Sequence, residues 1–114
     1  MPGKLSTHVL DLTTGRPAAD MRIELWNHDG KHTLLKAVNT NLDGRTDEPL
    51  LVAATMAVGS YELVFFVKDY YVTHHKDSPF LDRVPVRFAI ADAAAGYHVP
   101  LLVTPWAYST YRGS

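Results

Sequence analysis

Hydrophobic and polar side chains alternate along several short stretches of this chain. In residues 21–27, "MRIELWN", the side chains of Met21, Ile23 and Leu25 share one face, and Arg22, Glu24 and Trp26 occupy the other. The same period of two runs through three further stretches: "SYELVFFV" (60–67), "VPVRFAI" (84–90) and "YHVPLLV" (97–103). A two-residue period is typical of β-strands that bury one face. We therefore predict a strand in each stretch.

Turn-forming sequences separate these stretches, among them "TGRP", "HDG", "LDGR", "VGS" and "ADAAAG". Strands spaced about ten residues apart with such turns indicate an all-β sandwich. The segment "VKDYYVTHHKDSPF" lacks the alternation. There we predict one short helix over Tyr70–Lys76, capped by Asp69 and ended before Pro79. Pro85 and Pro100 interrupt strand-like runs, and we expect each at a bulge or an unpaired position.

The composition narrows the class of protein. The chain has 114 residues, of which 46% are hydrophobic and 20% charged, as expected for a single folded domain over residues 1–114. The net charge is -1 and no basic run exists, which argues against nucleic acid as a partner. The absence of cysteine excludes disulfides and thiolate chemistry. The sequence shows neither a secretory signal nor a membrane-spanning run, so we expect a cytoplasmic protein with no membrane partner.

Four of the six histidines lie in loop-like sequence. His28 and His32 are four residues apart, but the Asp-Gly pair between them indicates a turn rather than one face of a helix. His74 and His75 are adjacent, and adjacent side chains diverge in most backbones. The spacing therefore predicts no metal site, and we expect all four to be solvated loop histidines.

The other two histidines, His8 and His98, lie in strand-like runs and point away from the core. In "LSTHVLDL", His8 shares a face with Ser6, opposite the predicted core face. His98 likewise alternates with the apolar positions of "YHVPLLV". From the pattern alone, each histidine is either an exposed strand residue or part of a site. Arg45, after the "LDG" turn, equally fits a solvated hairpin arginine. Three aspartates fit turn or cap residues: Asp11, Asp43 and Asp69.

Three blocks of the chain stand out: "LSTHVLDLTTGRPA" (5–18), "TNLDGRTDEPLL" (40–51) and "YHVPLLVTPWAYSTYRGS" (97–114). Together they resemble the 5-hydroxyisourate hydrolases, the transthyretin-like enzymes of purine breakdown. The final "YRGS" is the most specific part, since in this family it distinguishes the enzyme from transthyretin. The resemblance implies a transthyretin-like fold with two four-stranded antiparallel sheets and one short helix. It also implies a homotetramer, a dimer of dimers, with active sites in a central channel.

The resemblance also implies a set of site residues and a reaction. The family's catalytic residues fall on His8, Arg45 and His98, and its substrate-binding tail falls on Tyr111, Arg112, Gly113 and Ser114. The implied reaction is hydrolysis of 5-hydroxyisourate to 2-oxo-4-hydroxy-4-carboxy-5-ureidoimidazoline without a cofactor. The sequence alone does not rank the two histidines; we favour His98 as the base, with His8 orienting the water or the base, and assign Arg45 to the substrate or its oxyanion.

The chain's end is expected to form a wall of this site. In that interpretation Tyr108 and Tyr111 anchor the last strand by packing. Gly113 lets the backbone bend or approach the ligand closely. Arg112 binds the substrate or fixes the tail through an ion pair.

Two other classes of protein remain open. One is a transthyretin-type binding protein that carries an apolar ligand in the channel, although the imidazoles and the guanidinium argue against it. The other is an accessory sandwich module of the kind attached to peptidases. Such modules are parts of longer chains, whereas this chain is expected to be complete.

Overall fold

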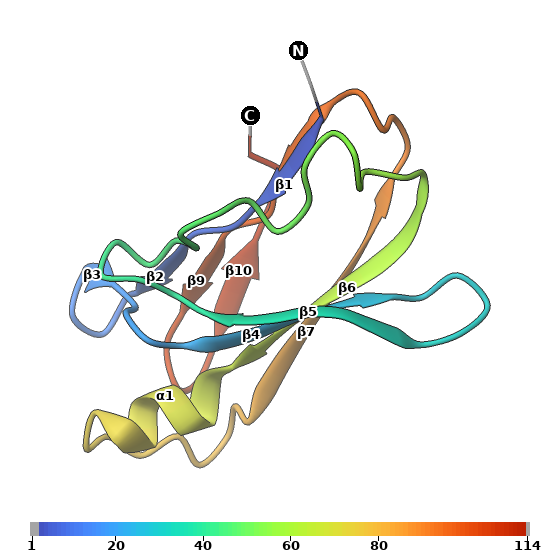
Figure 1. The fold of residues 1–114 in the computed structure, drawn as a ribbon. Helices are drawn as coiled ribbons and strands as arrows, with labels where there is room; N and C mark the ends of the chain where they lie inside the picture. The colour runs from blue at the N-terminus through green and yellow to red at the C-terminus, as the bar shows by residue number, and fades with distance from the viewer. Residues whose placement is uncertain (1–2, 114) are drawn as a thin grey trace.

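The computed structural model describes residues 3–113 (Figure 1). Its elements, in chain order, are β1 (Lys4–Ser6), β2 (Val9–Asp11), β3 (Arg16–Pro17), β4 (Arg22–Asn27), β5 (Thr33–Asn39), β6 (Gly59–Phe66), α1 (Val67–Thr73), β7 (Arg83–Ile90), β8 (Gly96–His98), β9 (Leu101–Val103) and β10 (Tyr108–Thr110).

The strands form a two-layer sandwich, which confirms the predicted fold class. One layer is an antiparallel sheet in the order β5-β4-β6-β7. The other has the order β10-β9-β2-β3 and is extended by the pair β1-β8. In this second layer β2 pairs with β9, and β1 with β8, in parallel. The expectation of two antiparallel sheets is therefore wrong in this detail, because β1 and β2 run in the same direction as their partners β8 and β9.

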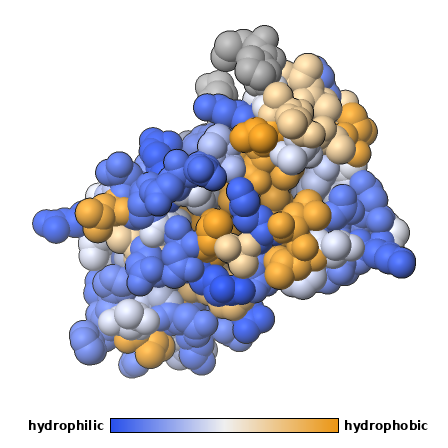
Figure 2. Space-filling model, in the orientation of Figure 1, coloured by the Kyte–Doolittle hydropathy of each residue, from blue (hydrophilic) through white to orange (hydrophobic). Residues whose placement is uncertain are grey.

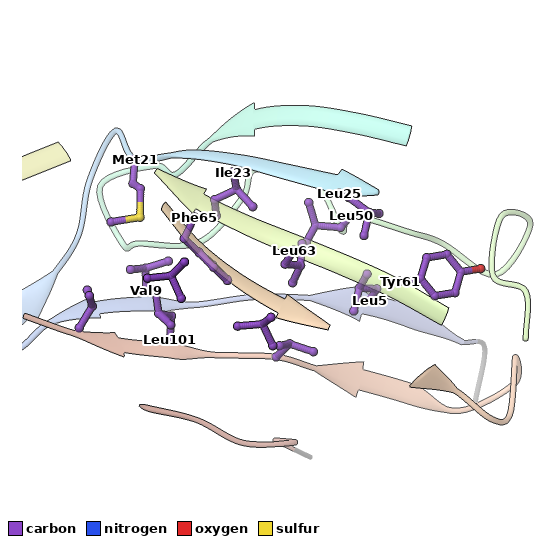
Figure 3. Packing of buried hydrophobic residues seen from close by; sticks show 14 of the residues in the cluster. Leu5, Val9, Met21, Ile23, Leu25, Leu50, Tyr61, Leu63, Phe65 and Leu101 are labelled. Carbon is purple, nitrogen blue, oxygen red and sulfur yellow. The ribbon is translucent and has the colours of Figure 1, made fainter. Parts of the chain in front are cut away.

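The core lies between the two layers, and the predicted alternation selects its residues. Met21, Ile23 and Leu25 are fully buried from β4, as are Leu63 and Phe65 from β6. Figure 3 shows these side chains directed toward apolar residues of the opposite layer: Leu5, Val9 and Leu101. Complete burial of one such side chain stabilises the fold by about 1.5–3 kcal/mol. The strand faces that carry His8 and His98 point away from this core.

The helix begins and ends earlier than its predicted bounds. It starts at Val67, directly after β6, and its N-cap residue Phe66 makes no side-chain capping bond. Asp69 lies in the first turn and does not cap the helix. The prediction relied on a capping residue, whereas the observed helix is fixed by packing, with Val67, Tyr70 and Tyr71 buried.

A buried carboxylate joins this helix to β2. Asp11 accepts hydrogen bonds from the hydroxyls of Tyr70 at 2.9 Å and Tyr71 at 2.8 Å, and from the backbone N–H of Thr13 at 2.9 Å. Burial alone would raise the pKa of the Asp11 carboxyl, but the hydrogen bonds outweigh burial and lower that pKa below its ordinary value. The prediction that Asp11 is a turn residue is correct, because it accepts the N–H of Thr13. It is incomplete, because Asp11 also anchors α1.

The expectation of a bulge or an unpaired position holds for Pro100 and is wrong for Pro85, which is paired within an edge strand. Pro85 lies on β7, an edge strand, opposite Val64 and without a bulge. Pro100 lies in the break between β8 and β9. Within residues 3–113, no helix has both the length and the apolar character needed to cross a bilayer.

Candidate functional site

The site is built on two chain segments that run side by side in the second layer. Ser6 of β1 is paired with His98 of β8, and Val9 of β2 with Leu101 of β9. Between these pairs, the backbone N–H of Leu101 donates to the carbonyl oxygen of His8 at 2.9 Å. Because the intervening residues face the core, Ser6, His8 and His98 lie on the opposite face of the layer. This arrangement confirms the predicted orientation of both histidines, which are half-buried.

The imidazole of His98 is held by a neighbour on the adjacent strand. The hydroxyl oxygen of Ser6 lies 2.9 Å from Nδ1 of His98. Sequence reasoning placed Ser6 on the face of His8 but gave it no role. The available signal was the two-residue spacing of Ser6 and His8. The missing information was the parallel register that brings Ser6 to His98.

The surroundings of His98 disfavour its protonated form. Burial is the largest cause of its lowered pKa, followed by the positive charges of Arg45, His8 and Lys4. The pairing of β1 and β2 with β8 and β9, and the hydrogen bond from the N–H of Val9 to the carbonyl oxygen of Gly44, bring His8, His98 and the loop of Arg45 into one region. A histidine with a lowered pKa is neutral at neutral pH, and a neutral imidazole can accept a proton.

Arg45 reaches this region because a tight loop is fastened to β2. The side chain of Asn41 accepts hydrogen bonds from the backbone N–H groups of Asp43 at 2.9 Å and Arg45 at 3.2 Å. The carbonyl oxygen of Gly44 accepts from the N–H of Val9 at 2.8 Å, one residue after His8. Gly44 has φ +73°, and a Cβ there would lie 2.4 Å from the carbonyl oxygen of Val9. The "LDGR" sequence therefore needs glycine at this position to place Arg45.

The segment after β10 flanks the other side of His98. The N–H of Gly113 donates to the carbonyl oxygen of His98 at 2.7 Å. A Cβ on Gly113 would lie 2.6 Å from Cδ2 of His98. The expected close approach therefore occurs, but in this chain it is made to His98. Ser114, the last predicted site residue, lies outside the described residues.

The other predicted tail residues behave differently from expectation. Arg112 donates to the carbonyl oxygen of Gly96 at 3.0 Å, and its guanidinium lies 4.3 Å from the ring centre of Tyr97. Within residues 3–113 it forms no ion pair, so that proposed fixation is replaced by a hydrogen bond and a cation–π contact. Tyr108 and Tyr111 are 45% and 58% exposed, so neither anchors the strand by packing within this chain.

A shallow pocket of about 200 Å³ lies beside these residues, lined by Ser6, Arg45 and their neighbours. A larger hollow of about 630 Å³ lies between β5 and residues 48–55, and its lining is mainly apolar. We place the candidate site at the smaller pocket because it is lined by Arg45 and by Ser6, the hydrogen-bond partner of His98, whereas His8 and His98 themselves lie outside its lining.

The comparisons with known proteins agree with this fold. The family model described as the HIUase/Transthyretin family matches residues 5–113. The chain belongs to this family. It is 51% identical over 117 residues to 5-hydroxyisourate hydrolase 2 of Rhizobium meliloti (strain 1021), with 98% of this chain and 97% of the relative covered.

Two solved structures extend the comparison. Klebsiella pneumoniae 5-hydroxyisourate hydrolase superposes with a TM-score of 0.85 at 32% identity, covering 98% of this chain and 99% of that one. An (S)-allantoin synthase superposes with a TM-score of 0.93 at 43% identity, covering 98% of this chain. This chain spans 44% of that synthase and therefore corresponds to one part of it.

Proposed function

We propose that this protein hydrolyses 5-hydroxyisourate. The observation that carries the proposal is that His8 and His98 share one non-core face, beside the loop that carries Arg45. It is supported by full-length relatives that are named for this activity. Hydrolysis of a ring C–N bond beside a carbonyl makes three demands. The attacking water must lose a proton, the carbonyl oxygen must be stabilised as it gains charge, and the leaving nitrogen must gain a proton.

His98 meets the first demand. We assign the tautomer in which Nδ1–H donates to the hydroxyl oxygen of Ser6, so that Nε2 carries the lone pair that accepts the proton of water. The lowered pKa of His98 keeps this nitrogen available at neutral pH. His98 then gives the proton taken from water to the leaving nitrogen of the substrate ring as the C–N bond breaks. The imidazole therefore ends each turnover neutral. His8, on the same face, orients the water or the base.

Arg45 meets the second demand. A guanidinium remains charged at any physiological pH and binds adjacent oxygens through its planar fork. Its charge is placed where the carbonyl oxygen becomes negative during attack, which lowers the barrier. Gly113 closes the site on the side of His98, while Tyr111, Arg112 and Ser114 supply the remaining substrate contacts.

The working form is proposed to be a homotetramer assembled as a dimer of dimers. Each layer ends in an open edge, β10 on one side and β7 on the other. The chain exposes large apolar side chains, including Trp106 at 64%, Tyr111 at 58% and Leu12 at 50%. Figure 2 shows apolar side chains gathered on part of one face amid mainly hydrophilic surroundings. Association through these edges would cover apolar area and turn the shallow pocket into an enclosed channel.

One assay tests the proposal. A catalytic amount of protein should remove the absorbance of 5-hydroxyisourate faster than its spontaneous decay. An unchanged decay rate would contradict the proposal, and binding of an apolar ligand without turnover would instead support a transthyretin-type carrier. The cytoplasmic location stays a prediction from the sequence.

A further inference from the structure

A second group of titratable side chains lies in the other layer, at the β4–β5 hairpin. His28 follows β4, His32 precedes β5, and Glu62 lies on the adjacent strand β6. The turn between the histidines folds them toward each other, with ring centres 4.2 Å apart. The expectation of a solvated loop histidine fits His32, whose side chain is 50% exposed, and is wrong for His28, whose side chain is 18% exposed. Spacing did not reveal the pair because a hairpin turn brings together residues that a helix would have to place on one face.

The three side chains present one ligand atom each to a common point. Nε2 of His28 lies 3.2 Å from Oε2 of Glu62, and Nε2 of His32 lies 3.8 Å from Oε1 of the same carboxylate. All three ligand atoms lie within 4.8 Å of one another. In a tetrahedral zinc site with bonds of about 2.0–2.2 Å, ligand atoms are separated by about 3.3 Å. A small closing movement of the exposed His32 would satisfy this geometry.

Two of the ligand groups, the His28 imidazole and the Glu62 carboxylate, are largely buried, and a cation would stabilise them there. Nε2 of His28 is buried and has no hydrogen-bond partner among the described residues, since its approach to Glu62 does not have hydrogen-bond geometry. The Glu62 side chain is 10% exposed. A buried nitrogen lone pair beside a buried carboxylate is costly unless a shared proton or a metal ion binds both.

The neighbouring groups leave one open side. The carboxylate of Asp29 accepts the N–H of Ser60 at 3.1 Å and is thereby occupied. Arg87 donates to Oε2 of Glu62 at 3.3 Å, from a side chain that is 65% exposed. Its charge opposes a second cation, but solvent screens it, and the bond orients the carboxylate. Water completes the coordination on the exposed side of His32.

We propose that His28, His32 and Glu62 form a zinc site that fastens the β4–β5 hairpin to β6. Two imidazoles and one carboxylate form a ligand set suited to Zn²⁺, with water as the fourth ligand. The site lies in the opposite layer from His8 and His98, and its role is structural. It revises the expectation from sequence spacing that the chain has no metal site.

A tryptophan provides a local probe. The ring of Trp26 stacks on His32 with centres 4.1 Å apart, whereas the other tryptophan, Trp106, contacts Phe80. In a Trp106→Phe protein, Co²⁺ should quench the fluorescence of Trp26, and Zn²⁺ should displace the Co²⁺ and restore it. Calorimetry with ZnCl₂ should give one zinc per chain at this site.

Four variants decide the proposal. In the same background, His32→Ala and Glu62→Gln should weaken zinc binding at Trp26 by at least about 10-fold. His75→Ala removes an exposed histidine outside the cluster and should leave binding unchanged. His98→Asn should also retain the quenching, which separates this site from any metal held by His8 and His98. Equal zinc affinity in all four proteins, or no quenching and no calorimetric binding in the parent, would overturn the proposal and leave a histidine–glutamate ion pair.

Discussion

The hydroxyl of Ser6 lies 2.9 Å from Nδ1 of His98, across the parallel pair β1-β8. This contact fixes the orientation of the imidazole. The first prediction concerns this residue. Ser6→Ala should lower kcat by up to about 100-fold with little change in KM, because a misplaced base slows the chemical step more than it weakens binding.

Two matched variants test whether Ser6 acts through His98. Ser6→Thr keeps the hydroxyl and should retain most of the rate. Ser60→Ala, in the opposite layer, should leave kcat unchanged. Equal rates for Ser6→Ala and wild type would show that the packing of His98 suffices without this hydrogen bond.

The second prediction concerns pH. Because burial and then Arg45, His8 and Lys4 lower the pKa of His98, the acid limb of kcat/KM should lie below the ordinary histidine pKa of about 6.5. Arg45→Gln removes the largest of the charge contributions, so the limb should move to higher pH even though the rate falls. Arg16→Gln, an exposed arginine on β3, should leave the limb in place. An Arg45→Gln limb at the wild-type pH would mean that Arg45 does not act on the titrating group.

The third prediction concerns the close approach of Gly113 to His98. Gly113→Ala places a Cβ 2.6 Å from Cδ2 of the imidazole, so the ring or the tail must move. We expect a loss of roughly 100-fold in kcat, while the fold is retained. Gly96→Ala provides the control, because a Cβ at Gly96 meets no heavy atom within 4 Å. If both variants keep the full rate, the position of the segment after β10 is irrelevant to catalysis.

The fourth prediction concerns stability. Asp11→Asn keeps the size of the side chain but weakens its acceptance of two buried tyrosine hydroxyls, and should cost about 1–3 kcal/mol of unfolding free energy in urea. The folded pKa of Asp11 is lowered, so its carboxylate contributes stability above the unfolded pKa and loses that contribution as pH falls through the folded pKa. The variant should therefore show a flatter acid dependence. Asp43→Asn, in an exposed turn, should match wild type at every pH.

The sequence does not predict β5, whose side chains are mostly exposed. It predicts β4, β6 and β7 well because their two-residue period directly records which side chains are buried. Met21, Ile23 and Leu25 illustrate this, since all three are fully buried. It predicts the helix less well, because Tyr70 and Tyr71 are held by Asp11, about sixty positions earlier in the chain. Local capping signals carry no information about such a contact.

The site residues likewise divide into those that local pattern predicts and those that tertiary contacts bring together. Alternation places His8 and His98 on the non-core face, but only the resemblance to a family connects them with Arg45. The contact of Ser6 with His98 and the pairing of His28 with His32 depend on strand register and turn geometry. Both are set by tertiary packing, so spacing along the chain does not reveal them.

The central claim is that His98 is the base that activates water for hydrolysis of 5-hydroxyisourate. The most direct measurement is the initial rate of loss of 5-hydroxyisourate absorbance with wild-type protein and with His98→Asn at equal concentration. Urea unfolding of separate samples compares the stability of the two proteins. The account predicts that wild type greatly accelerates the loss, and that His98→Asn lowers the rate by roughly 100- to 10,000-fold with similar unfolding free energy. A His98→Asn protein that turns over the substrate at the wild-type rate would contradict the account.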